Sequence, residues 1–210
     1  FELNFKNRAD FFGFGEQTNH PTRTILENFV KELHDGSVFS ETKTDIEVQF
    51  AICGSFAAYL HAEYAELTAQ SKARLDPVAC IELKIFCRDH EADLNLVRDA
   101  LIVPAVNAYV EKPANWKFHI ETGENGEIYL FLPQKKTLGR FEYRPLVVKI
   151  LVKKDFWPKI AFVRGFPVLS LRDLIREYDR KAAHAGEWGR IQKLKDTSEI
   201  LRGMLTKFDY

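Results

Sequence analysis

The sequence has no excess of charge of either sign and no long hydrophobic run, and both absences exclude classes of protein. Its 30 basic and 30 acidic residues cancel over 210 residues, so no overall field draws the chain toward nucleic acid or a membrane surface. No stretch approaches the roughly 18 uninterrupted apolar residues of a membrane span. The opening "FELNFKNRADFF" has neither an initiating Met nor the layout of a signal peptide. We therefore expect a soluble, cytoplasmic protein without a membrane partner.

Cysteine is also scarce. The chain has three, Cys53, Cys80 and Cys87, and each lies in or beside an apolar run. An odd number in a chain of this length does not fit a secreted disulfide scaffold and favours buried, reduced thiols. No CxxC or HxxxH spacing occurs, so the histidines and cysteines show no metal-binding motif.

The sequence has ample hydrophobic residues, at 46%, to bury a full core. Apolar residues at helical spacing predict helices over 22–34, from Ser55 to about 67, over 89–103, from 171 to 183 and over the last twenty residues. In the second of these helices, Phe56, Leu60, Tyr64 and Leu67 are expected on the inner face. The runs "IEVQFAIC", "ACIELKIFC" and "RPLVVKILV" are typical of buried strands.

One more pair of strands is predicted around Asn125-Gly126, whose tolerance of positive φ suits a hairpin turn. The resulting order is helix, strand, helix, strand, helix, hairpin, strand and two helices. It predicts an α/β (α+β) fold, with a mixed sheet flanked by helices and followed by a C-terminal helical hairpin. We expect residues 1–167 to form the sheet domain and residues 168–210 the helical hairpin packed on it.

The junction Gly54-Ser55 joins the first predicted strand directly to a helix. A glycine lets the backbone approach a phosphate closely, and the free N–H groups of the next helical turn then face the anion. The serine hydroxyl adds one more donor. Taken alone the pair is a weak motif, because small turns also join strands to helices, and both interpretations stay open.

Four features of the chain belong together: Gly54-Ser55 after a strand, Glu82 within "IELKIF", the strand "VVKILV", and the tail segments "FPVLSLRDLIREYDRK" and "GRIQKLKDTSEILRGML". In combination they resemble the nucleotidyltransferase superfamily, and within it the minimal nucleotidyltransferases of the abortive-infection toxin type. The resemblance covers about residues 46 to 205 and is strongest in the tail. It implies a nucleotidyltransferase-like mixed sheet, transfer of a nucleoside monophosphate from an NTP to RNA or protein, and Mg²⁺ as cofactor.

The resemblance also implies roles for individual residues. Glu82 is implied to be the catalytic carboxylate and a metal ligand. Residues implied to hold the phosphates or to neutralise their charge are Gly54, Ser55, Lys84, Lys149, Arg190 and Lys195. The family also has a lysine in the preceding helix, for which Arg180 and Lys181 are both candidates. An equal alternative is that residues of the last helix brace the two lobes of the nucleotidyltransferase fold. The spacing does not place all three of Arg190, Lys195 and Asp196 on one face of that helix.

The sequence departs from the family at two of its three carboxylate positions. Lys84 occupies the second, and Lys149 the natural place of the third. An ammonium group repels Mg²⁺, so conventional two-metal catalysis would be lost. We therefore predict a degenerate active site that binds a nucleotide, another phosphate-bearing ligand or a partner protein without metal. The alternative is an active enzyme that uses Mg²⁺ and an RNA or protein acceptor.

Three structural alternatives remain for this strand face. Glu82, Lys84 and Lys149 could form a buried cluster in which lysine charges replace the metal. The alignment could instead be shifted, with Asp76 or Asp89 near the site. Finally, the face could be an ordinary polar surface exposed to solvent.

Overall fold

The computed structural model describes residues 48–88, 95, 98–99, 119–131, 136–138, 140–143, 146–154 and 156–208. The helices predicted over 22–34 and 89–103 lie outside these residues, except for Asn95, Arg98 and Asp99. Within the described ranges, no helix has both the length and the apolar character needed to cross a membrane.

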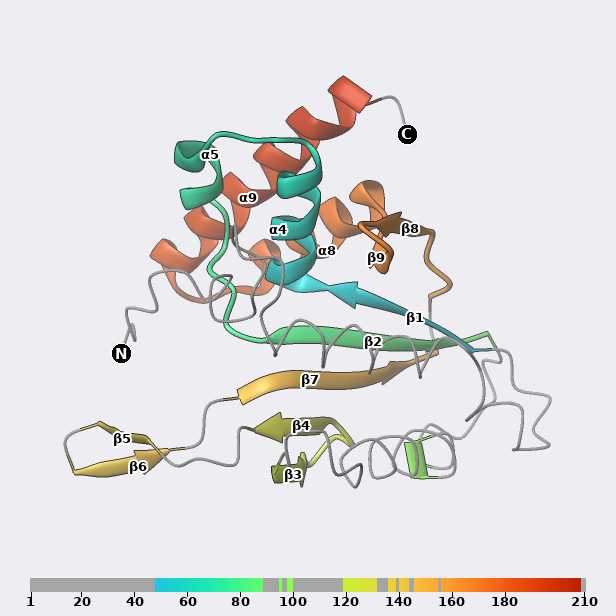
Figure 1. Cartoon of the computed structure of the whole chain (residues 1–210), viewed down its shortest axis with the longest axis vertical. Helices are drawn as coiled ribbons and strands as arrows, with labels where there is room; N and C mark the ends of the chain where they lie inside the picture. Colours follow the sequence, from blue (N-terminus) through green and yellow to red (C-terminus); the bar gives the residue numbers. More distant parts are fainter. Residues whose placement is uncertain are drawn as a thin grey trace. The chain divides into compact units, whose positions relative to one another are not determined.

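A seven-stranded mixed sheet is the main element of the structure (Figure 1), with strand order β3-β4-β7-β2-β1-β9-β8. Its strands are β1 (Val48–Cys53), β2 (Ile81–Cys87), β3 (His119–Thr122), β4 (Ile128–Phe131), β7 (Leu146–Lys153), β8 (Ile160–Val163) and β9 (Phe166–Leu169). Strand β1 runs parallel to β9, whereas β3-β4, β4-β7 and β8-β9 are antiparallel. A separate hairpin joins β5 (Lys136–Leu138) to β6 (Phe141–Tyr143). The predicted mixed sheet is confirmed.

By compactness the chain divides into two units. One comprises residues 1–50 and 83–157, and the other residues 51–82 and 158–210. Strands β1 and β2 each contribute residues to both. The predicted division into 1–167 and 168–210 stays a prediction.

The first unit contains the predicted hairpin. β3 and β4 pair in register from His119 opposite Phe131 to Thr122 opposite Ile128. Gly126 has a φ of +79° in the connecting turn, as the Asn125-Gly126 pair predicts. β4 then pairs with β7, where Tyr129 lies opposite Lys149.

The second unit contains four helices, α4 (Gly54–Tyr64), α5 (Ala69–Ala73), α8 (Leu171–His184) and α9 (Trp188–Phe208). α8 and α9 pack against each other and α4 packs on both (Figure 1), so the predicted C-terminal helical pair is confirmed. The Ser170 hydroxyl caps α8 by accepting a hydrogen bond from the Asp173 N–H at 3.3 Å. The Asp173 carboxylate accepts from the Ser170 hydroxyl in return, at 3.1 Å. These two hydrogen bonds fix the start of α8.

Two features of the second unit differ from the sequence prediction. Helix α4 is buried around most of its circumference and ends at Tyr64, which is 53% exposed, so Tyr64 and Leu67 do not extend an inner face. The β8-β9 hairpin was not predicted, because its strands have four residues each and the second contains Pro167. Its turn is formed by Arg164 and Gly165, both at positive φ.

Candidate functional site

At the start of helix α4, Gly54 has no side chain and another residue approaches it closely. Strand β1 leads into it without a loop, and Gly54 has a φ of +65°. A methyl group added at Gly54 would lie 3.3 Å from Oε2 of Glu82 and 3.6 Å from its Cβ. The helix has Cys53 as N-cap, which provides no side-chain hydrogen bond. Gly54 therefore gives Glu82 room to lie directly against the N-terminal end of α4.

A lysine from α8 lies beside this glutamate. The ammonium nitrogen of Lys181 is 3.8 Å from Oε2 of Glu82 and 2.5 Å from Oε1 of Glu177. Glu177 is buried and is one helical turn before Lys181, whereas the Glu82 side chain is 21% exposed. Of the two cations that the sequence offers on α8, Lys181 is the one found at Glu82. A positive charge thus lies between two carboxylates from different elements.

A second charged pair ties α9 to the connection between α5 and β2. Asp76 is only 7% exposed and accepts hydrogen bonds from both terminal nitrogens of Arg190, with 3.1 Å between Oδ2 and Nη2. The Asp76 N–H donates to the hydroxyl of Thr197 at 2.8 Å. Arg190 therefore ties α9 to the loop that contains Asp76. The roles predicted for Arg190, at the phosphates or between the lobes, stay predictions.

Tyr178 of α8 precedes Lys181 by three residues and is fully buried. Within the described residues its hydroxyl group has no hydrogen-bond partner. Burial raises the pKa of the phenol well above its usual value, and the negative charges of Asp76, Glu177 and Glu82 add to this effect. Arg190 opposes it. The phenol is thus neutral and surrounded by carboxylates.

Lys84 and Lys149 belong to the first unit. Lys84 is 7% exposed in a strand that is buried on both faces, so the solvent-exposed alternative is wrong at this position. The Lys149 ammonium lies 5.5 Å from the ring centroid of Tyr129 on the neighbouring strand. The predicted cluster of Lys84, Lys149 and Glu82 stays a prediction.

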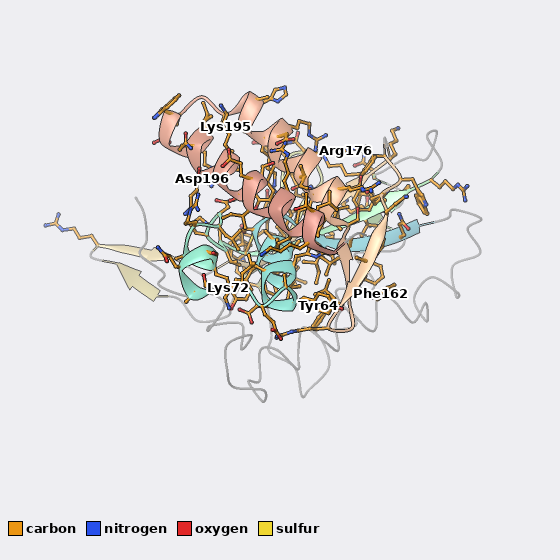
Figure 2. All side chains as sticks on the ribbon, turned by 90° about the horizontal axis from the view of Figure 1, so that it is seen from above. Tyr64, Lys72, Phe162, Arg176, Lys195 and Asp196 are labelled. Carbon is orange, nitrogen blue, oxygen red and sulfur yellow. The ribbon has the colours of Figure 1, made fainter. Side chains whose placement is uncertain are left out.

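The remaining predicted site residues of the second unit are Lys195 and Ser55. Lys195 is exposed on α9, and its neighbour Asp196 accepts a hydrogen bond at 2.8 Å from Gln192 on the same helix (Figure 2). Ser55 follows Gly54 in the first turn of α4 and is half-buried. Asp89 lies outside the described residues.

The sequence interpretation missed Tyr178 and Glu177 as site residues. Tyr178 has an inward helical position and there looks like an ordinary core aromatic. The available signal is Glu177, an acidic residue that precedes it on the inner side of α8 and is four residues from Lys181.

Among the described residues, the side chains near Glu82 do not fit a conventional Mg²⁺ site. In the parts of the chain that the structure describes, no three His, Cys, Asp or Glu side chains are grouped so as to hold a metal ion. The carboxylate of Glu82 has the ammonium of Lys181 next to it, where a two-metal enzyme would need further carboxylates.

The chain is similar to several solved structures. These include the Megavirus polyadenylate synthase, at 11% identity and a TM-score of 0.47 over 91% of this chain and 37% of the other. An antigenic nucleotidyltransferase-like protein from Paracoccidioides brasiliensis is 13% identical, with a TM-score of 0.38 over 89% of each chain. The small alarmone synthetase 1 of Bacillus subtilis is 12% identical, with a TM-score of 0.32 over 96% of this chain and 93% of the other.

This chain spans little more than a third of the polyadenylate synthase. No protein-family model and no curated protein sequence matches it. At such low identity the likeness says nothing of chemistry, which has to come from the residues of this chain.

Proposed function

We propose that this protein is nucleotidyltransferase-like and binds a nucleotide or a similar phosphate-bearing ligand at the start of α4, without the two-metal chemistry of an active transferase. The observation that carries the proposal is the position of Lys181, whose ammonium group lies 3.8 Å from Glu82 beside Gly54. In this arrangement a lysine from α8 supplies the positive charge that a metal ion would supply in a catalytic site.

The backbone at Gly54 is suited to an anion. The first N–H groups of a helix lack intrahelical partners and carry partial positive charge, and α4 receives no side-chain cap from Cys53. Ser55 contributes a hydroxyl group in the same turn. A ligand phosphate here would accept from these donors and from the Lys181 ammonium.

Glu82 opposes this binding because its carboxylate already lies at the helix start. A phosphate and a carboxylate repel each other, and Lys181 reduces that repulsion. The proposal therefore predicts that Glu82→Gln strengthens the binding of a nucleotide in the absence of metal. An enzyme that uses Glu82 to hold Mg²⁺ would instead lose nucleotide affinity through the same change.

The test is calorimetric titration of the wild type with each of the four NTPs, first with Mg²⁺ and then with EDTA. The expected result is binding to at least one NTP that survives EDTA. Glu82→Gln should tighten it, and Lys181→Met should weaken it roughly tenfold, the scale of one charge-assisted contact. Lys207→Ala, an exposed lysine at the far end of α9, is the matched control and should bind as the wild type does.

The other outcomes are equally informative. Binding that requires Mg²⁺ and is lost in Glu82→Gln would overturn the metal-free site in favour of the active enzyme, and a screen for RNA and protein acceptors would follow. No binding to any NTP under either condition would leave Gly54-Ser55 as a turn. Melting temperatures of the three variants separate a lost contact from a lost fold.

A further inference from the structure

The buried phenol of Tyr178 lies among groups of restricted hydrogen-bonding capacity. The carboxylates of Asp76, Glu82 and Glu177 can only accept hydrogen bonds, and the cationic groups of Lys181 and Arg190 can only donate them. Tyr178 can do both, and its hydroxyl has no partner within the described residues. Such a group in a native structure calls for a partner beyond the described residues, and a water molecule or part of a ligand can supply it.

The surroundings select the chemistry of that partner. A phosphate group, which only accepts, would meet the repulsion of three carboxylates. An ammonium group, which only donates, could not accept the hydrogen of the phenol. A sugar hydroxyl both donates and accepts and carries no charge, so it can receive the phenol hydrogen and donate to a carboxylate.

Lys181 connects the phenol to the proposed phosphate position. The Lys181 ammonium lies 5.7 Å from the ring centroid of Tyr178 and close to Glu82, which itself lies against Gly54. Lys181 is partly exposed and has a flexible stem. A ligand phosphate at Gly54 would therefore lie close to the same ammonium group that contacts the Tyr178 ring.

We propose that Tyr178, together with Asp76, recognises the ribose hydroxyl groups of the bound nucleotide and makes this protein selective for ribonucleotides. This inference rests on the proposed nucleotide site and adds a residue that distinguishes between sugars. Arg190 holds Asp76 in place through two hydrogen bonds, and is therefore a positioning residue in this recognition.

The experiment separates the sugar from the phosphates. Calorimetric titrations in EDTA use inorganic tripolyphosphate and the ribo, 2′-deoxy and 3′-deoxy forms of the NTP with the highest affinity. The proteins are the wild type, Tyr178→Phe and Tyr64→Phe. Tyr64 is a matched control, because it is exposed at the end of α4 (Figure 2). Melting temperatures are measured for all three.

The expected result is that the wild type binds the ribonucleotide at least about fivefold more tightly than one of the deoxy forms, the scale of one neutral hydrogen bond. Tyr178→Phe should remove this preference without weakening tripolyphosphate binding and without lowering the melting temperature, because no internal hydrogen bond is lost. Tyr64→Phe should keep the preference.

Equal affinity of the wild type for all sugars would overturn the inference while the phosphate site stands. So would a preference that persists in Tyr178→Phe. A lower melting temperature of Tyr178→Phe with an unchanged preference would assign the phenol to a structural water. Failure of both tripolyphosphate and every nucleotide to bind would overturn the nucleotide site itself.

Discussion

Helix α9 carries two arginine–aspartate pairs that are alike in chemistry and different in burial. Arg190, in the first turn, binds Asp76, which is 7% exposed. Arg202, about three turns later, binds Asp179 at 2.6 Å, and the Asp179 side chain is 46% exposed. Solvent reaches both side chains of the second pair, whereas in the first pair it reaches the arginine and has little access to the aspartate. The end of α9 next to Tyr178 is therefore fixed by its ion pair, whereas the far end depends on packing.

The most direct test of this difference between the two pairs is Arg190→Met. The change leaves the Asp76 carboxylate, which is 7% exposed, without its counter-ion. Because the Arg190 side chain is 48% exposed, the cost is that of an unpaired buried carboxylate and not of a fully buried ion pair, and we expect the free energy of unfolding to fall by about 1–3 kcal/mol. Urea denaturation measures it. A loss below about 1 kcal/mol would show that Asp76 reaches solvent and would contradict the contrast between the two pairs.

A smaller loss in the free energy of unfolding is expected at Gly54, where a substitution strains the backbone and removes no charge. Gly54→Ala places a methyl group at a φ of +65° and should lower the free energy of unfolding by about 1–2 kcal/mol. Gly165→Ala is the matched control, because Gly165 also has a positive φ, +83°, with nothing within 4 Å of the added methyl. A larger loss at Gly54 than at Gly165, measured by the same denaturation, assigns the difference to the contact with Glu82. Equal losses would mean that Glu82 moves aside freely.

The burial of His61 should make the free energy of unfolding depend on pH. His61 is buried and donates through Nε2 to the Leu169 carbonyl at 2.9 Å, and burial lowers its pKa from the usual 6.5. Below pH 6.5, His61 therefore becomes protonated in the unfolded chain while it stays neutral in the folded chain. The free energy of unfolding does not depend on His61 above that pH and decreases below it, by at most about 1.4 kcal/mol per pH unit.

Denaturation of the wild type and His61→Gln between pH 7.5 and 5.5 checks this expectation. The variant keeps a donor for Leu169 and should show a flatter profile than the wild type. Parallel profiles for wild type and His61→Gln would contradict the assignment.

The smallest effect is expected from Arg202→Met at the exposed pair. Both side chains are about half exposed, so the free energy of unfolding should fall by about 0.2–1 kcal/mol. Added salt should reduce the difference between this variant and the wild type further, because exposed charges are screened. A loss as large as that of Arg190→Met would mean that burial does not decide the value of these pairs.

The sequence predicts local elements of this fold well and long-range partners poorly. Alternation and helical spacing locate β1, α4, β2, the β3-β4 hairpin and the two last helices, because side-chain periodicity is a property of neighbouring residues. The partner of Glu82 is 99 residues away at Lys181, and that of Asp76 is 114 residues away at Arg190. No local pattern encodes such distances.

The candidate site shows the same limit. Gly54 is marked by its position between a strand and a helix, Glu82 is implied by the family resemblance, and the structure brings the two together. The isolation of the Tyr178 hydroxyl depends on every element around it, so its place in the sequence resembles that of any core aromatic. The burial of Lys84 was likewise open, because alternation in a strand does not tell which face is covered.

The thiol of Cys53 immediately precedes Gly54, and this adjacency provides a built-in reporter of local opening. Cys53 is fully buried and its Sγ lies 3.5 Å from the Ala51 carbonyl oxygen. An alkylating reagent can reach it only when the junction of β1 and α4 separates, so the rate of its modification records how often the start of α4 opens. A ligand that binds to the first turn of α4 would slow that rate, and mass spectrometry of the alkylated peptide would detect binding without any label on the ligand.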